Sequence, residues 1–416
     1  MTAIRNPIAG VLGSRLLRSR HLGSRLLAAE SGREGDRVTT LELFFDLVYA
    51  FAFTQVASLM AHGTAISALQ GLVVLSLLWW SWTSYAWLAN QAHADRGIVR
   101  VGVMSAIAIM FLVSLTIPEA YHDRAGGLFA PMVFVVGYIA VRVVHAVVYI
   151  VAAGTDAALR RQIIVSMTSA LLPAAALLVI GALVGAPYQV WIWLVAIALD
   201  LIVVYLTSSG GSWRLPSVAH FAERHGLIVM LALGESVVAI GAGSARLALS
   251  VPIVVGAVLG VALAIGLWWT YFNHLSAKAE REVGRQQGVK RVGMATDAYT
   301  YLHFALVAGI ILTALGIERA MEQVASSEPL GLFAAGALGG GVAVYLAGTG
   351  FFWRRVSGEW ALVRFSGAAL AVVAIPLLRV VPALVGVGVV VVILIVLIVV
   401  EQLLGQRAKI RSRAAA

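Results

Sequence analysis

Stretches of about 20 apolar residues recur along the chain, separated by short polar breaks such as 118–127 and 318–329. An α-helix of this length crosses the hydrocarbon core of a membrane. The pattern therefore predicts an all-α polytopic membrane protein with about 12 transmembrane helices. The expected spans are 42–62, 68–90, 98–117, 128–152, 163–185, 188–207, 224–243, 251–275, 295–317, 330–353, 365–379 and 382–404.

The composition supports this fold class. The chain is 61% hydrophobic and 12% charged, whereas soluble domains are typically about 25% charged. A soluble core could not bury so much apolar surface. The chain has no cysteine, which excludes disulfides, thiolate ligands and a cysteine nucleophile.

Lys and Arg are concentrated in every second break between the apolar stretches, and this distribution predicts the orientation of the chain. With 12 spans and a cytoplasmic N-terminus, 25 of the 30 Lys and Arg fall on the cytoplasmic side. The outer loops hold only Arg124, Arg246, Arg319 and Arg379, and Arg142 lies within a span. This asymmetry is typical of multi-pass membrane proteins and places both termini in the cytoplasm. It also explains the net charge of +10 without a nucleic-acid partner.

The N-terminal segment, residues 1–38, is rich in arginine and contains the sequence GSRLL twice. Two interpretations stay open: an amphipathic helix on the anionic cytoplasmic leaflet, or a disordered basic tail. No cleavable signal peptide is evident. The expected organisation continues with a six-helix half (39–207), a second six-helix half (208–404) and a basic cytoplasmic tail (405–416).

The two halves show an internal sequence repeat. LELFFDLVYAFAFTQ (41–55) aligns with AERHGLIVMLALGES (222–236), WWSWTSY (79–85) with WWTYFNH (268–274), and LTIPEAY with LGIERAM. Because six spans separate the copies, both begin on the cytoplasmic side, and the repeat is parallel. Transporters built from two such halves place their binding sites between them.

Two of these segments carry a family resemblance. LELFFDLVYAFAFTQ, followed by HFAERHGLIVMLALGESVVAIG (220–241), resembles the bacterial low-temperature-requirement protein A (LtrA) family, and WWTYF and YLHFALVAGI fit the same pattern. The resemblance covers about residues 38–400. It implies a multi-pass protein of the bacterial inner membrane, linked to growth in the cold. It implies no established reaction or substrate.

Acidic residues inside the first and seventh spans are the main candidates for a binding site. Glu42 and Asp46 are one turn apart and share a helix face, whereas Gln55 points to roughly the opposite side. Glu223 aligns with Glu42, and Glu235 lies deep in the seventh span. A carboxylate within a membrane is costly and indicates function. The alternatives are a favourable charge at a helix N-terminus for the Glu42–Asp46 pair and a protonated, hydrogen-bonded Glu235.

Other ionisable residues lie inside or at the edges of the spans. Arg142 and His145 share a face, and Asp200, Asp46 or Glu42 could supply the counter-charge of Arg142. Such a network could be functional, or it could only fix the register of the helices. Further candidates for the site are His274, Asp297 and His303.

A metal site is a weaker hypothesis. His220, Glu223 and His225 resemble, with one extra residue, the H-x-x-E-H pattern of zinc enzymes. No Walker or G-x-G-x-x-G loop occurs, so no nucleotide cofactor is expected. Three GxxxG pairs (181/185, 256/260 and 336/340) predict close contacts between helices.

Three functions are compatible with these features. We favour a transporter or channel-like permease for a small solute, cation or proton. The alternatives are an intramembrane enzyme that acts on a lipid or hydrophobic molecule through the His/Asp/Glu cluster, and a non-catalytic envelope or cold-stress protein. Between transport and enzymatic catalysis, we favour transport.

Overall fold

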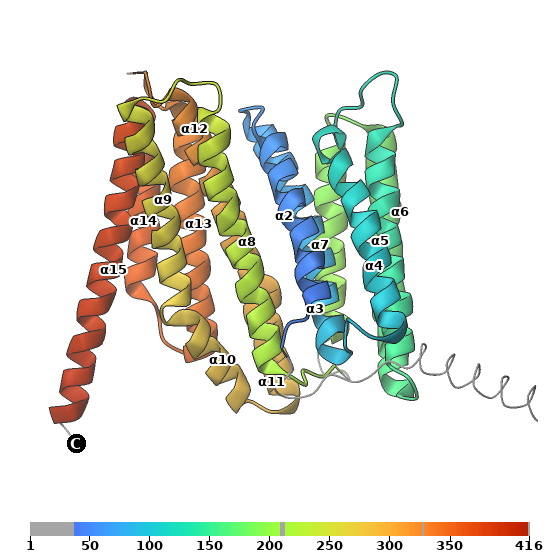
Figure 1. The fold of residues 1–416 in the computed structure, drawn as a ribbon. Coiled ribbons are helices and arrows are strands. Elements are labelled where there is room, and N and C mark those ends of the chain that lie inside the picture. Colours follow the sequence, from blue (N-terminus) through green and yellow to red (C-terminus); the bar gives the residue numbers. More distant parts are fainter. Residues whose placement is uncertain (1–36, 209–212, 327, 415–416) are drawn as a thin grey trace, which may run out of the picture.

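The computed structural model describes residues 37–208, 213–326 and 328–414 and consists of long helices (Figure 1). Twelve helical segments in these ranges are long and apolar enough to cross a membrane, which confirms the expected number. The segments of the first half are α2 (Thr40–Met60), α3 (Ala65–Gln91), α4 (Gly97–Thr116, continued by the short helix η1, Ile117–Glu119), α5 (Ala130–Ala152), α6 (Ala157–Val184) and α7 (Gln189–Ser208).

The second half contains additional short helices between its long ones. Its elements are α8 (Val218–Ser244), α9 (Val251–Phe272), α10 (Leu275–Arg285), α11 (Gly288–Ala295), η2 (Thr296–Leu302), α12 (His303–Gln323), α13 (Gly331–Ser357), α14 (Leu362–Val380) and α15 (Ala383–Ala414). The ninth span is not one regular helix, because η2 is a π-helix between α11 and α12. Turns of π-helix occur often at functional sites.

The structure describes the C-terminal end of the chain further than the N-terminal end. The expected N-terminal segment lies, up to residue 36, outside the described residues. The expected tail begins as a continuation of the last span, since α15 extends to Ala414. Figure 1 places this end of α15 on the same side of the bundle as the start of α2.

Polar caps fix where several helices begin. Thr64 and Ser67 form a reciprocal capping box at α3, and Asp156 and Ser217 accept hydrogen bonds from the first turns of α6 and α8. These caps satisfy backbone N–H groups that have no partner inside the helix. The polar residues of the breaks therefore set the boundaries of the apolar helices.

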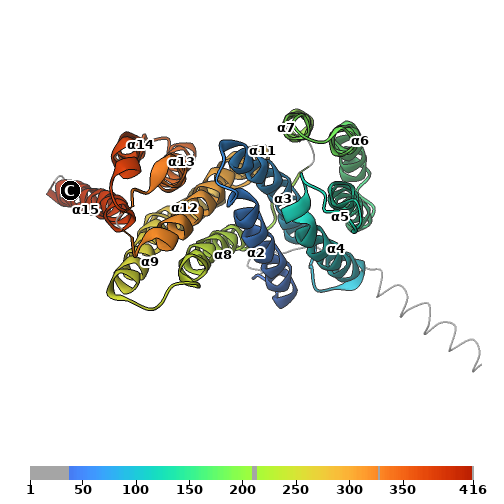
Figure 2. The ribbon, with the colours of Figure 1, turned by 90° about the horizontal axis from the view of Figure 1, so that it is seen from above.

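The helices form two groups whose members have corresponding neighbours. In the first group α2 packs on α3 and α4, α4 on α5, and α7 on α6 and α3. In the second group α8 packs on α9 and α12, α12 on α13, and α15 on α14 and α9. The groups meet where α2 and α3 contact α8 and α12, at the centre of the molecule seen from above (Figure 2). This central interface is called the seam below.

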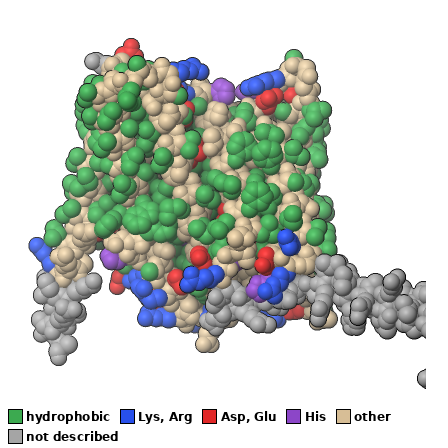
Figure 3. All heavy atoms as spheres, in the orientation of Figure 1, with side chains coloured by type: hydrophobic (Ala, Val, Ile, Leu, Met, Phe, Trp, Pro, Cys, Tyr) green, Lys and Arg blue, Asp and Glu red, His purple; other side chains and the backbone are tan. Residues whose placement is uncertain are grey.

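The outer surface is typical of a protein surrounded by lipid. Figure 3 shows apolar side chains over the middle of one face and charged side chains towards its ends. Many large apolar side chains are exposed along the helices, for example Leu47, Leu172, Val195 and Val373. Hydrocarbon solvates such side chains, so their exposure needs no covering partner.

Glycines bring α12 and α13 into close contact. A Cβ atom added at Gly309 would lie 2.6 Å from the backbone nitrogen of Tyr345, and one at Gly316 would lie 2.5 Å from that of Leu338. The GxxxG prediction is only partly correct. Gly256 and Gly260 face side chains of neighbouring helices, whereas the pair at 336 and 340 faces nothing within 4 Å. Small residues allow close helix packing only where they face a neighbour.

Candidate functional site

The site is built around the N-terminus of α2. Thr39 caps this helix, and its backbone N–H and hydroxyl donate to Oε2 of Glu42 at 2.7 and 2.8 Å. The N–H of Glu42 donates in return to the Thr39 hydroxyl at 3.3 Å. This reciprocal capping box occupies Oε2 of Glu42 and so holds the Glu42 side chain in place. The other oxygen is left for a partner from another helix.

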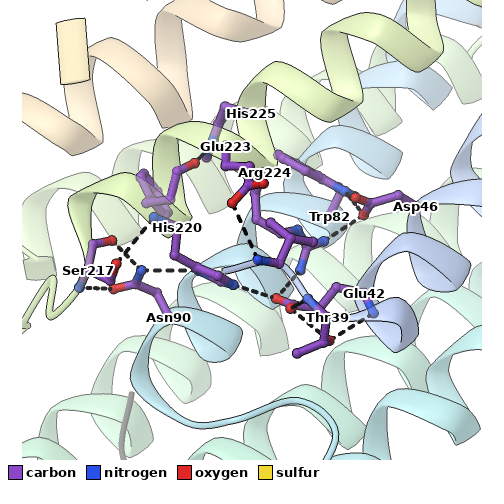
Figure 4. A network of polar contacts seen from close by, with 12 residues as sticks. Thr39, Glu42, Asp46, Trp82, Asn90, Ser217, His220, Glu223, Arg224 and His225 are labelled. Atoms are coloured by element: carbon purple, nitrogen blue, oxygen red, sulfur yellow. Dashed lines mark hydrogen bonds and ion pairs between the residues drawn. The ribbon is translucent and has the colours of Figure 1, made fainter. Parts of the chain in front are cut away.

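That partner is Arg224 of α8, on the far side of the seam (Figure 4). Its Nη1 donates to Oε1 of Glu42 at 2.9 Å, and its Nη2 donates to Oδ1 of Asp46 at 2.6 Å. Trp82 of α3 donates its indole N–H to the same Oδ1 at 2.8 Å. The prediction that Glu42 and Asp46 share a face is confirmed, because one guanidinium binds both carboxylates.

His220, one turn before Arg224 on α8, joins the same carboxylate. Its Nε2 lies 3.0 Å from Oε1 of Glu42. Asn90 of α3 holds the other side of the ring, since its Nδ2 lies 3.3 Å from Nδ1 of His220 and donates to the carbonyl of Ser217 at 2.6 Å. A ring nitrogen that accepts from Asn90 leaves Nε2–H to donate to Glu42.

All four charged or ionisable groups are buried: Glu42, Asp46, His220 and Arg224. The two carboxylates share one guanidinium, and His220 contacts Glu42 as well. Buried ions of this kind are stable only while each keeps its partner. The network therefore ties α2 and α3 to α8 across the seam.

Glu235 lies further along α8 and has a different environment. It is 6% exposed, and its Oε2 accepts a hydrogen bond from the Thr54 hydroxyl of α2 at 2.7 Å. Within the described ranges no Lys, Arg or His forms an ion pair with it. Gln55, the neighbour of Thr54, is half-buried. Glu235 is thus a buried carboxylate without a basic partner among the described residues, and its hydrogen bond to Thr54 crosses the seam.

His225 and His303 form an aromatic cluster beside the charged network. The ring of His225 lies 5.0 Å from Trp82, 5.0 Å from Tyr299 and 5.3 Å from His303, centroid to centroid. Its Nδ1 contacts the carbonyl of Phe221 at 2.8 Å, and its Nε2 has no hydrogen-bond partner among the described residues. The π-helix η2 supplies Tyr299 to this cluster.

His303 itself is fully engaged. Its Nδ1 lies 2.9 Å from the carbonyl oxygen of Ala298, and its Nε2 lies 2.8 Å from the hydroxyl of Tyr271. Both contacts fix the ring at the junction of η2 and α12. The seam therefore contains a rigid wall of rings next to the charged groups.

A second ion pair lies within the first half. Arg142 of α5 donates through Nη1 to Asp200 of α7 at 3.0 Å and to the Tyr138 hydroxyl at 3.2 Å. Of the three acids considered as its counter-charge, Asp200 is the partner in the structure. His145, on the same face of α5 as predicted, bonds through Nε2 to the carbonyl of Ser84 at 3.0 Å.

Glu223, His274 and Asp297 make no ion pair with the described carboxylates or basic groups of this network. Glu223 and His274 are exposed. Glu223 still lies beside the network (Figure 4), where its Oε2 accepts a hydrogen bond from the N–H of Val38 at 3.4 Å. Asp297 forms an ion pair of 2.8 Å with Arg355 of α13. These three residues do not converge on the seam carboxylates.

The proposed metal ligands do not come together either. His220 and His225 are buried, whereas Glu223 between them is exposed. Over the described part of the chain, no group of three His, Asp or Glu side chains is arranged to hold a metal ion. The extra residue in the spacing explains this, because the three positions occupy different faces of α8.

Sequence reasoning missed the residues that organise the site. The sequence did not single out Arg224, Trp82 or Asn90 as candidates. In the structure Arg224 binds Glu42, Trp82 binds Asp46, and Asn90 contacts His220. A signal was present for Arg224: it lies four residues from His220 and four from Ile228, on the buried face of α8. A second missed pair, Arg364 with Glu401 at 2.8 Å, joins α14 to α15.

Twelve apolar helices, with buried ion pairs between two helix groups, define a multi-pass membrane protein with an interior polar network. The chain belongs to the bacterial low temperature requirement A protein (LtrA) family, whose model matches residues 37–399. It is similar to an uncharacterized protein of Rhizobium meliloti (strain 1021), with 26% identity over 335 residues and 76% of each chain covered. No solved structure gives a significant match.

Proposed function

We propose that this protein is a transporter in the bacterial cytoplasmic membrane, in which two six-helix halves move against each other and carry a proton or small cation on Glu235. The position of Glu235 carries the proposal. It is buried in α8, is hydrogen-bonded across the seam to Thr54 and lacks a basic partner among the described residues. An unpaired carboxylate inside a membrane protein is typical of proton and ion pathways.

The division into two halves is supported by packing as well as by sequence. The contacts of α2, α3 and α4 correspond to those of α8, α9 and α12, which contain the matching segments. The four helices α2, α3, α8 and α12 form the seam. Transporters with two parallel repeats bind their substrate at such an interface and move one half against the other.

Polar contacts across the seam suit an interface that opens and closes. Trp87 donates to the Thr300 hydroxyl at 3.0 Å, and Asn90 donates to the Ser217 carbonyl at 2.6 Å. Water can replace such contacts when the halves separate, whereas an extensive apolar interface would resist separation. In this mechanism the Glu42–Asp46–Arg224 network closes one end of the seam, and Glu235 binds the cargo.

The orientation follows from the basic residues. The excess of Lys and Arg in alternate loops supports an orientation with both termini in the cytoplasm. The network of Glu42 and Arg224 then closes the cytoplasmic end of the seam. Glu235, further along α8, is reached from the other side.

Glu235→Gln is expected to abolish transport, because glutamine keeps the shape and the bond to Thr54 but binds neither a proton nor a cation. Liposomes containing the purified protein and an internal pH dye would receive a pH step, and in parallel experiments Na⁺ or K⁺ gradients. The wild-type protein should dissipate one of these gradients faster than protein-free liposomes, and the variant should not.

Glu322→Gln is a matched control, since Glu322 lies near the end of α12, its side chain is 40% exposed, and it already has a basic partner in Arg319 at 2.8 Å. It should transport like the wild-type protein. Equal flux in wild-type and Glu235→Gln liposomes would contradict the role of Glu235. Wild-type flux no faster than that of empty liposomes for every gradient would contradict transport and favour a structural role for the network.

A further inference from the structure

A cavity lies between α3, α5 and α7 of the first half and the α11–η2 segment of the second. Its water-accessible volume is about 70 Å³. Its walls are largely aromatic and include Trp80, Tyr149, Trp213 and Tyr301. Apolar and aromatic walls with a few polar groups are typical of a site for a small organic ligand.

Arg142 is the one Lys or Arg among the residues that line the cavity, and it is fully buried. Its Nη1 is used by Asp200 and Tyr138. Its Nε and Nη2, which form the adjacent edge of the guanidinium, have no hydrogen-bond acceptor among the described residues. This is the edge that binds the two oxygens of a carboxylate or phosphate in a bidentate manner.

Other donors around the cavity are also without acceptors. The indole N–H groups of Trp80 and Trp213 and the hydroxyl of Tyr149 are buried and make no hydrogen bond to a described residue. The ring of Trp80 lies 5.9 Å from the central carbon of the Arg142 guanidinium. Because buried donors almost always have partners, this concentration of free donors in one cavity points to a ligand rich in acceptors.

His145 adds a hydrogen-bond acceptor to these donors. Its Nε2 donates to the Ser84 carbonyl, so the neutral ring leaves Nδ1 as an acceptor. Nδ1 has no partner among the described residues. It can accept a hydrogen bond from a hydroxyl of the ligand, for example that of a singly protonated phosphate.

From this geometry we infer that the cavity binds an organic anion whose carboxylate or phosphate lies on the free edge of Arg142 and whose apolar or aromatic body packs against the tryptophan and tyrosine rings. Asp200 does not line the cavity and is held on the other side of the guanidinium. Lys and Arg side chains gather at the end of the molecule where α10 and α11 lie (Figure 3), which favours the approach of anions.

The cavity also depends on both halves. Thr296, Thr300 and Tyr301 of the second half form part of its wall, and Tyr301 donates to the carbonyl of Leu201 in α7 at 3.1 Å. A bound anion would therefore contact both sides of the boundary between the halves. Binding is independent of whether Glu235 carries a proton, so this inference does not rest on the proposed transport.

Calorimetric titration of the full chain in detergent tests the site. The probes are benzoate and phenyl phosphate, benzyl alcohol as a neutral analogue, and dioctanoyl phosphatidate as a soluble lipid. We expect saturable binding of at least one anionic probe and none of benzyl alcohol. Binding of benzoate or phenyl phosphate would identify a soluble organic anion as the ligand class, and binding of phosphatidate alone would identify a lipid headgroup.

Two conservative variants separate the site from protein stability. Tyr149→Phe removes a hydroxyl that no described residue binds, so the protein should fold normally and bind the anion about tenfold more weakly. Arg142→Lys keeps the charge beside Asp200 but lacks the planar fork, and should weaken binding by more than about tenfold.

Tyr121→Phe is the matched control. Tyr121 is also buried with a hydroxyl that has no partner among the described residues, but it does not line the cavity. Its variant should bind like the wild-type protein. Equal binding of benzyl alcohol and benzoate, absence of binding by all probes, or unchanged affinity in both Tyr149→Phe and Arg142→Lys would overturn the inference.

Discussion

Replacement of Arg224 by alanine is expected to lower the free energy of unfolding by about 3–5 kcal/mol, because it leaves two buried carboxylates without their cation. Glu42 and Asp46 receive hydrogen bonds of 2.9 and 2.6 Å from this guanidinium. Thermal unfolding of the purified protein in detergent would show the loss as a large decrease in Tm. Proteolysis at a fixed temperature would give an independent measurement.

The network also predicts which further changes restore stability. The triple variant Arg224→Met, Glu42→Gln, Asp46→Asn removes all three charges together and should recover most of the lost Tm, since neutral groups cost less to bury than an unpaired ion. Arg214→Ala is the control. Arg214 forms an ion pair of the same kind with Asp156 at 2.8 Å, but its side chain is 68% exposed, so its removal should cost about 1 kcal/mol or less. Equal Tm values for Arg224→Ala and Arg214→Ala would show that the seam network contributes no stability.

The second large effect is expected at the contact of α12 with α13. Gly309→Ala places a methyl group 2.6 Å from the backbone nitrogen of Tyr345 and 2.8 Å from the carbonyl oxygen of Gly341. Backbone cannot rotate away as a side chain can, so the two helices must separate. Overpacking of this kind costs about 1–3 kcal/mol, which the same thermal unfolding measurement would detect.

A glycine on α13 should respond in the opposite direction. Nothing lies within 4 Å of a Cβ atom at Gly340, and alanine in a helix is favoured over glycine by about 0.5–1 kcal/mol. Gly340→Ala should therefore leave Tm unchanged or raise it slightly. A decrease at Gly340 as large as that at Gly309 would contradict the packing of α12 on α13.

These two expectations concern different kinds of interface. The α12–α13 contact is close and made by backbone, so these helices should move as a unit. The seam between α2 and α8 contains ion pairs and hydrogen bonds, which can exchange with water. Motion in the proposed transport cycle is therefore expected at the seam. The cavity beside Arg142 is lined by residues of both halves, so this motion would change its shape.

The sequence determined the class of protein and the number of helices. Apolar runs must be about as long as the membrane is thick, so the count of 12 could be made from hydrophobicity alone. The spacing of four residues placed Glu42 and Asp46 on one face, since the geometry of a helix is local. Polar caps such as Thr39 likewise act within a single turn.

The tertiary structure decided which charges pair and which glycines matter. Arg224 is about 180 residues from Glu42, and Arg142 had three possible acids, of which packing selected Asp200. Whether a glycine faces a neighbouring helix depends on how the two helices are rotated about their axes. The spacing of glycines in the sequence therefore could not distinguish Gly309 from Gly340. The cavity beside Arg142 likewise required side chains from both halves to be placed in space, because burial and pairing are properties of the assembled helices and not of any one of them.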